Sequence, residues 1–172
     1  MVGWLMATVY IETSIVSYLR QRPSSQVVMV ARQLLTHQWW NEERENYDLV
    51  TLQYVIDEAS SGDPTLAAER LESLEGIPLL GLDRQVEEIA EEIIRRAILL
   101  PKASVDALHI AVAACHVIGY LLTWNCTHIA NARILPRVYD VLRDMGCAIP
   151  VICTPEEMVD DGSEEDASRY DP

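Results

Sequence analysis

Four polar side chains stand in apolar surroundings where a parallel sheet would bring them together. Glu12 and Asn125 each directly follow a short apolar run that is typical of a buried strand, Glu58 lies just after another such run, and Asp106 lies in an otherwise apolar helical segment. Ligands of open α/β sheets bind at the carboxyl edge of the strands. Carboxylates and an amide oxygen at that edge suit Mg²⁺ or Mn²⁺, and the chemistry that such a cluster favours is metal-assisted phosphodiester hydrolysis.

Further polar residues surround these positions: Thr13, Ser14, His109, His128 and Asn131. The two hydroxyls could cap a helix that starts after Glu12 or face a metal, and the first histidine lies one helical turn from Asp106. The last two could approach a phosphate or metal through the loop after Asn125. A simpler interpretation stays open for each, because capped helices often follow strands and a buried histidine is often only a hydrogen-bonded core residue.

Alternating strand and helix patterns must position these side chains. The expected strands cover residues 8–12, 47–52, 76–81, 120–123 and 148–152, and the expected helices cover 15–20, 26–44, 54–60, 64–74, 83–99, 104–118, 128–131 and 136–145. Strands that alternate with helices predict a parallel sheet with right-handed crossovers and helices on both faces.

Length and composition favour one globular domain. The chain has 172 residues, of which 49% are hydrophobic, which suffices for one substantial core. Its four cysteines show no tight ligand spacing, so reduced thiols in a cytoplasmic protein are expected. No basic leader or membrane-length apolar run is visible, and either Met1 or Met6 could be the natural start.

The net charge of −14 counts against a general nucleic-acid binder. About half of it comes from residues 155–172, which hold eight acids and one arginine. Residues 160–172 have the polar, acidic composition of a disordered tail. In the remaining body, clustered acids could form a metal site instead of a repelling surface.

These residues, taken in order, resemble the PIN-domain family, and within it the VapC-like toxins of prokaryotic type II toxin–antitoxin systems. The resemblance is carried by Tyr10-Ile11-Glu12-Thr13-Ser14, Val55-Ile56-Asp57-Glu58, Asp106-Ala107-Leu108-His109-Ile110-Ala111 and Leu122-Thr123-Trp124-Asn125. It implies a three-layer α/β sandwich over residues 1–159, with a central parallel sheet of about five strands flanked by helices.

The resemblance also implies an activity, a cofactor and partners. The activity is endoribonuclease cleavage that depends on Mg²⁺ or Mn²⁺. The catalytic positions fall on Glu12, Glu58, Asp106 and Asn125, and the first three would bind the metal. The implied partners are an RNA substrate, a small basic antitoxin and, since family members often dimerise, a second copy of the chain; no membrane is implied.

Two departures from the family pattern keep other functions open. The first acid is usually Asp but here is Glu12, and the residue after the fourth strand is usually Asp but here is Asn125, which brings no charge. The alternative function is therefore a PIN-fold binding module with weak or no catalysis. A phosphoacceptor signalling domain is disfavoured, because such domains need a lysine opposite the acids and the sole lysine, Lys102, precedes a helical segment instead.

Overall fold

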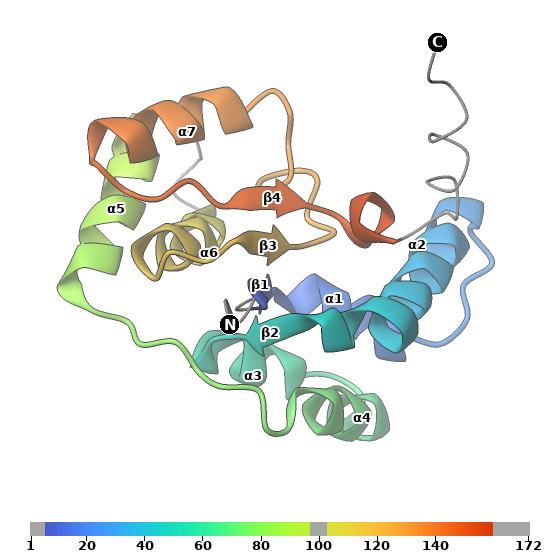
Figure 1. Ribbon diagram of the computed structural model, residues 1–172. Helices are drawn as coiled ribbons and strands as arrows, with labels where there is room; N and C mark the ends of the chain where they lie inside the picture. Colours follow the sequence, from blue (N-terminus) through green and yellow to red (C-terminus); the bar gives the residue numbers. More distant parts are fainter. Residues whose placement is uncertain (1–5, 97–102, 160–172) are drawn as a thin grey trace, which may run out of the picture.

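The computed structural model describes residues 6–96 and 103–159, which form an α/β fold around a parallel sheet (Figure 1). The sheet has four strands in the order β2-β1-β3-β4. Their bounds are β1 Ala7–Ile11, β2 Tyr47–Val50, β3 Tyr120–Leu122 and β4 Val151–Cys153. The expectation of a parallel sheet with interleaved helices is confirmed for this part of the chain.

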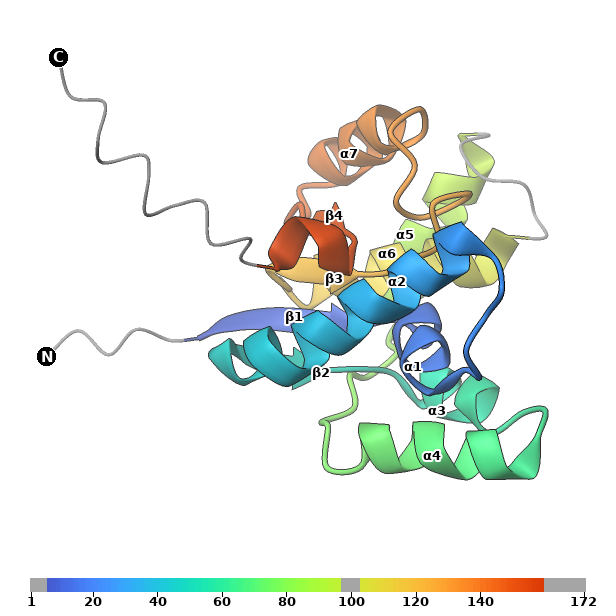
Figure 2. The ribbon, with the colours of Figure 1, turned by 90° about the vertical axis from the view of Figure 1, so that its right-hand side faces the viewer.

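Helices flank the sheet. They are α1 Thr13–Arg20, α2 Val27–Gln38, α3 Gln53–Ala59, α4 Pro64–Leu74, α5 Arg84–Arg95, α6 Ser104–Cys115 and α7 Leu135–Asp144. Figure 1 shows α5, α6 and α7 on the left and α1 and α2 on the right of the sheet. In both ribbon views α3 and α4 lie beside the β2 end of the sheet, and α7 lies beside the β4 end (Figures 1 and 2).

The strand expected at residues 76–81 does not form, so the described sheet has four strands and not five. This segment makes a single parallel bridge, Thr51 to Leu79. Thr51 donates its N–H to the Pro78 carbonyl at 3.0 Å, and its own carbonyl accepts the Leu80 N–H at 2.8 Å. Pro78 has no N–H to donate, and Gly76 has a φ of +79°, which no strand residue adopts. Both residues limit the ladder to one bridge.

The helix expected at residues 26–44 is shorter than predicted. Helix α2 ends at Gln38 and continues as a π-helical turn, η1 (Trp39–Glu43), and a 3₁₀ turn, η2 (Arg44–Asn46). The wider π turn lets both tryptophans, Trp39 and Trp40, point into the core, where they are 0% and 5% exposed. Trp39 stacks on Tyr47 of β2 with ring centroids 6.2 Å apart.

Other boundaries also differ from the sequence-based expectation. Residues 128–131 form turns and not a helix, and α6 ends at Cys115, before Val117 adopts a φ of +55°. The expected end of α5 at residues 97–99 and the expected disordered tail at 160–172 lie outside the described residues. A short 3₁₀ helix, η4 (Pro155–Met158), carries the capping box that its sequence predicts, from Thr154 to Glu157.

The two central strands bring their carboxyl ends together. Beyond the paired strands, Glu12 donates its N–H to the Leu122 carbonyl at 3.2 Å, and Thr123 donates to the Cys153 carbonyl at 3.0 Å. Helix α6 is apolar nearly all round and packs mainly against α5, with β3 beside it. The ladder and this buried helix fix the backbone from which the candidate site residues project.

Candidate active site at the carboxyl edge of the sheet

Glu12 is a buried carboxylate that caps α1. It is only 6% exposed. Its Oε2 accepts the Ser14 N–H at 3.1 Å, the Ser14 hydroxyl, and the Thr123 hydroxyl at 2.7 Å. These hydrogen bonds satisfy the polar side chain in its buried position. Among the described residues every hydrogen bond that the Glu12 side chain accepts goes to Oε2, so Oε1 is the oxygen left for another partner.

The two hydroxyls that bind Glu12 also fix the loop after β3. The Ser14 Oγ accepts the Trp124 N–H at 2.8 Å, and the Thr123 Oγ1 accepts the Asn125 N–H at 2.9 Å. Each hydroxyl therefore donates its one proton to Glu12 and accepts a backbone N–H in return. The loop backbone is thereby held at a set distance from the carboxylate.

Asn125 connects this loop to Asp106 on α6. Its Nδ2 donates to Asp106 Oδ1 at 2.8 Å, and its Oδ1 accepts the His128 N–H at 3.0 Å. This orientation of the amide is the one in which both contacts join a donor to an acceptor. The amide oxygen that the sequence suggested as a metal ligand is thus already used within the loop, and the amide nitrogen faces Asp106.

Glu58 is the outlying member of the acid set. It lies on α3 and is exposed, unlike Glu12 and the half-buried Asp106. The Thr13 hydroxyl donates a hydrogen bond to Glu58 Oε2, which ties α3 to the first turn of α1. Neighbouring residues of α1, Thr13 and Ser14, therefore each hold one acid, Glu58 and Glu12 respectively.

His109 is a buried histidine behind the acids. It is 1% exposed, and its Nδ1 lies 2.6 Å from the Tyr10 hydroxyl. Burial raises the pKa of Tyr10 well above its ordinary value, with further increases from the charges of Glu12 and Glu58. Tyr10 therefore stays protonated and donates to Nδ1, which places the ring proton of the neutral His109 on Nε2.

The electrostatics couple these groups. Burial is the main cause that raises the pKa of Asp106, and the negative charge of Glu12 raises it further. His128, His109 and the Asn125 amide act in the opposite direction but do not cancel the increase. A cation bound beside the two acids would lower the pKa of Asp106 again.

His109 should make the protein less stable in weak acid. Burial lowers its pKa from 6.5 to about 4, against smaller opposing effects of Glu58 and Asp106. The unfolded chain therefore binds a proton that the folded chain rejects, so the stabilisation is full above pH 6.5 and is lost as the pH falls toward 4. The loss is at most about 3 kcal/mol.

Chemical denaturation at pH 7 and pH 5 measures this loss. In His109→Gln the side chain can still accept the Tyr10 hydrogen bond but cannot titrate. We expect the unfolding free energy of His109→Gln to depend less steeply on pH than that of the wild type. Equal slopes for the two proteins would contradict the assignment, because the other carboxylates and histidines are common to both.

The candidate residues are of the types that bind Mg²⁺ or Mn²⁺, but their side chains do not form a complete coordination shell. Among residues 6–96 and 103–159, no group of three or more His, Cys, Asp or Glu side chains is placed to hold a metal ion. Mg²⁺ rarely needs such a cage, because it keeps several waters and is held by one or two carboxylates together with substrate phosphates. Glu12 and Asp106 are two carboxylates whose charges interact.

Most residues that the sequence suggested lie in one network, and some do not. The network contains Glu12, Ser14, Asp106, Asn125 and the His128 backbone, while Thr13 with Glu58, and His109, lie next to it. Asn131 is separate: its side chain donates to the Thr127 carbonyl at 2.8 Å and accepts the Arg133 N–H at 3.0 Å, which stabilises a turn.

Sequence reasoning missed two members of the site, Thr123 and Tyr10. Thr123 bonds both Glu12 and Asn125, and Tyr10 sets the tautomer of His109. A signal for Thr123 existed, because it is the hydroxyl that ends the apolar run before Asn125. Tyr10 gave none, since an aromatic residue inside a strand is ordinary core material.

No protein-family model, curated protein or solved structure matches this chain. The resemblance to PIN domains therefore rests on the sequence motifs alone. None of the helices in the described part of the chain has the length and apolar character needed to cross a bilayer.

Proposed function

We propose that this protein is a metal-dependent endoribonuclease of the PIN type and the toxin component of a toxin–antitoxin pair. The observation that carries the proposal is the hydrogen-bonded chain from Glu12 through Thr123 and Asn125 to Asp106 at the carboxyl edge of the sheet. It joins acids from separate elements, which is the arrangement that phosphodiester hydrolysis assisted by a cation requires.

Glu12 and Asp106 would hold the Mg²⁺ or Mn²⁺, with Glu58 as the third acid. When bound, the cation supplies an activated water and offsets the charge that develops on the phosphodiester. The free oxygen of Glu12 is Oε1, since the described hydrogen bonds use Oε2. On Asp106 it is Oδ2, since Asn125 binds Oδ1.

The remaining residues position these acids. Thr123 and Ser14 fix the rotamer of Glu12, the Asn125 amide fixes Asp106, and Thr13 holds Glu58. Because these donors are already in place, little reorganisation is needed when a substrate arrives. Asn125 carries no charge, so it orients Asp106 and does not act as a base.

Divalent metal should be required for cleavage. Purified protein with Mn²⁺ is expected to cut a labelled single-stranded RNA; excess EDTA should stop the reaction, and renewed Mn²⁺ should restore it. Gel analysis of the fragments measures this. Cleavage that survives EDTA would contradict the proposal, because the carboxylate site would then not be its source.

The net negative charge of the chain favours a basic protein as a partner. The net charge of −14 would repel RNA but attract a small basic antitoxin, whose Arg or Lys could occupy the cation position between Glu12 and Asp106. A reading frame for such a basic protein beside this gene would support the toxin role.

A second function, binding without efficient catalysis, is favoured by the orientation of Asn125. Its amide N–H donates a hydrogen bond to Asp106, and its oxygen accepts the His128 N–H, so Asp106 has a polar partner in the absence of a metal. Calorimetric titration with Mn²⁺ separates the two functions. The absence of binding heat at millimolar Mn²⁺ would favour the binding module and count against the nuclease.

A further inference from the structure

Arg32 of α2 lies against the loop that carries the candidate site, although the chain around it is strongly acidic. Its guanidinium carbon is 5.2 Å from the centre of the Trp124 ring and 5.8 Å from the centre of the Tyr18 ring. Its Nη1 donates to the Tyr18 hydroxyl at 3.2 Å, and its Nη2 lies 4.0 Å from the Cys126 sulfur. Trp124 and Cys126 are the two neighbours of Asn125 in the sequence.

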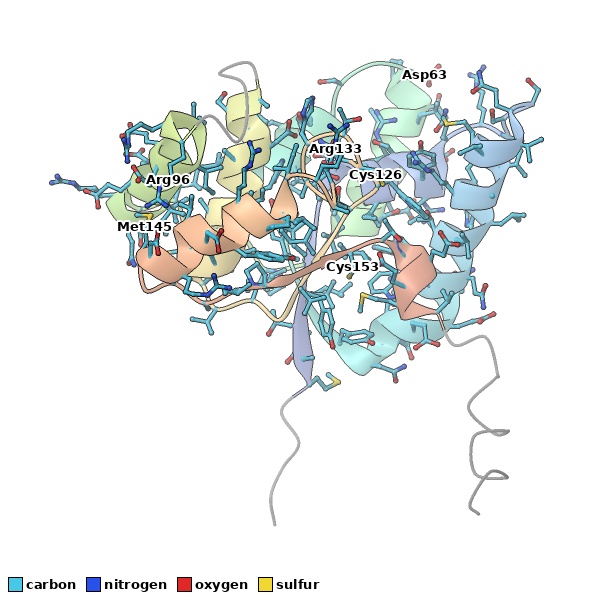
Figure 3. The ribbon with its side chains drawn as sticks, turned by 90° about the horizontal axis from the view of Figure 1, so that it is seen from above. Asp63, Arg96, Cys126, Arg133, Met145 and Cys153 are labelled. Carbon is cyan, nitrogen blue, oxygen red and sulfur yellow. The ribbon has the colours of Figure 1, made fainter. Side chains whose placement is uncertain are left out.

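The position of Arg32 is fixed by the same hydrogen bonds that build the site. Trp124 donates its ring N–H to the Thr36 hydroxyl at 2.7 Å, and that hydroxyl donates to the Arg32 carbonyl at 2.6 Å. The Trp124 backbone N–H binds Ser14, which in turn binds Glu12. Figure 3 labels Cys126 in the loop between β3 and α7, on the side toward α1 and α2.

The charge of Arg32 is not neutralised within the described residues. Arginines 22, 84, 95, 96 and 143 form ion pairs with acids, whereas Arg32 is paired with none in residues 6–96 and 103–159. It is half-buried, and its two hydrogen-bond contacts use only part of its N–H donors. The N–H groups of the guanidinium that are not used in these contacts can bind a phosphate oxygen.

We propose that Arg32, held over Trp124 and Tyr18, is a binding site for a backbone phosphate of the RNA strand next to the scissile bond. The inference rests on the proposed nuclease function and adds to it the residue that holds the polyanion. An acidic site repels RNA, so a fixed positive charge beside it is what the substrate requires. Arg32 of α2 is one such charge, and it lies against Trp124 and Cys126, the two sequence neighbours of Asn125.

Four proteins test the proposal: wild type, Arg32→Met, Arg32→Lys and Arg84→Met. Arg84→Met is the matched control, because it removes the same charge from an exposed arginine that is paired with Glu88 on α5. The kinetics of cleavage of a fluorescein-labelled single-stranded RNA with Mn²⁺ give kcat and KM. The anisotropy of the same RNA in EDTA, measured over a range of salt concentrations, gives binding without cleavage.

Arg32→Met should raise KM about tenfold with kcat nearly unchanged, and should reduce the slope of log affinity against log salt by about one. Arg32→Lys should restore the salt slope and part of the KM, because it keeps the charge but not the planar fork. Arg84→Met should resemble the wild type in both.

Three outcomes would overturn the inference. The first is an unchanged KM and salt slope in Arg32→Met. The second is a fall in kcat that accompanies a lower melting temperature and is not rescued by Lys, since Arg32 would then only support the fold. The third is a wild type that does not bind RNA at all. If the wild type binds RNA through Arg32 but does not cleave it, the nuclease proposal fails and the phosphate site stands.

Discussion

Replacing Asp106 with Asn should lower the kcat of RNA cleavage by about 100-fold or more while leaving the fold intact. Asn keeps an oxygen that can accept the hydrogen bond from the Asn125 amide, so the loop after β3 retains its anchor. What is lost is one of the two charges that would hold the cation. The measurements are single-turnover cleavage with Mn²⁺ and thermal unfolding of the same samples.

The stability of Asp106→Asn distinguishes a functional acid from a structural one. Burial raises the pKa of Asp106, so its charge costs folding free energy at pH 7, and the neutral Asn should be as stable as the wild type or more so. Asp57→Asn on the exposed side of α3, where the side chain contacts only Gln53 among the described residues, is the matched control and should keep full activity. Equal activity of Asp106→Asn and the wild type would refute the nuclease proposal.

Replacing Asn125 with Asp should make the fold depend on divalent metal. The change replaces the amide N–H that faces Asp106 Oδ1 at 2.8 Å with a second carboxylate. Without metal, one hydrogen bond is lost and two acids are in contact, which we expect to cost about 1–3 kcal/mol of unfolding free energy. With Mn²⁺ the added charge becomes a ligand, so the affinity for Mn²⁺ should rise by about tenfold or more.

Thermal unfolding of Asn125→Asp in EDTA and in Mn²⁺ measures the loss of stability without metal and its recovery with metal. Asn131→Asp is the control, because it makes the same chemical change six residues away, at a side chain that only stabilises a turn. Its melting temperature should respond to Mn²⁺ as the wild type does. If Asn125→Asp behaves like this control, Asp106 and Asn125 are not at a cation site.

The sequence predicted strands well where they are buried and separated from one another by helices. The apolar runs at β1 and β3 predicted the buried central strands, and their parallel direction follows from the helices between them. The prediction failed at residues 76–81. Pro78 weakened the strand signal there, and the single bridge that does form depends on the N–H and carbonyl groups of Thr51. It also failed at Trp39, where a π-helical turn that buries both tryptophans replaces the end of the expected helix.

The site shows the same division. Glu12 and Asn125 could be predicted to converge, because the carboxyl ends of parallel strands share one edge. The orientation of the Asn125 amide could not, since it depends on the His128 N–H accepted by its oxygen. Arg32 was invisible, because an arginine in the middle of a helix usually has no specific role, and only the fold brings it against Trp124.

The Glu12 side chain has two roles, one in the fold and one in the proposed site, and this has an evolutionary consequence. Its Oε2 caps α1 and receives the hydroxyls of Ser14 and Thr123, while Oε1 remains for chemistry. A lineage that lost the proposed reaction would still be selected to keep an acid at this position, because the fold uses it as the N-cap of α1.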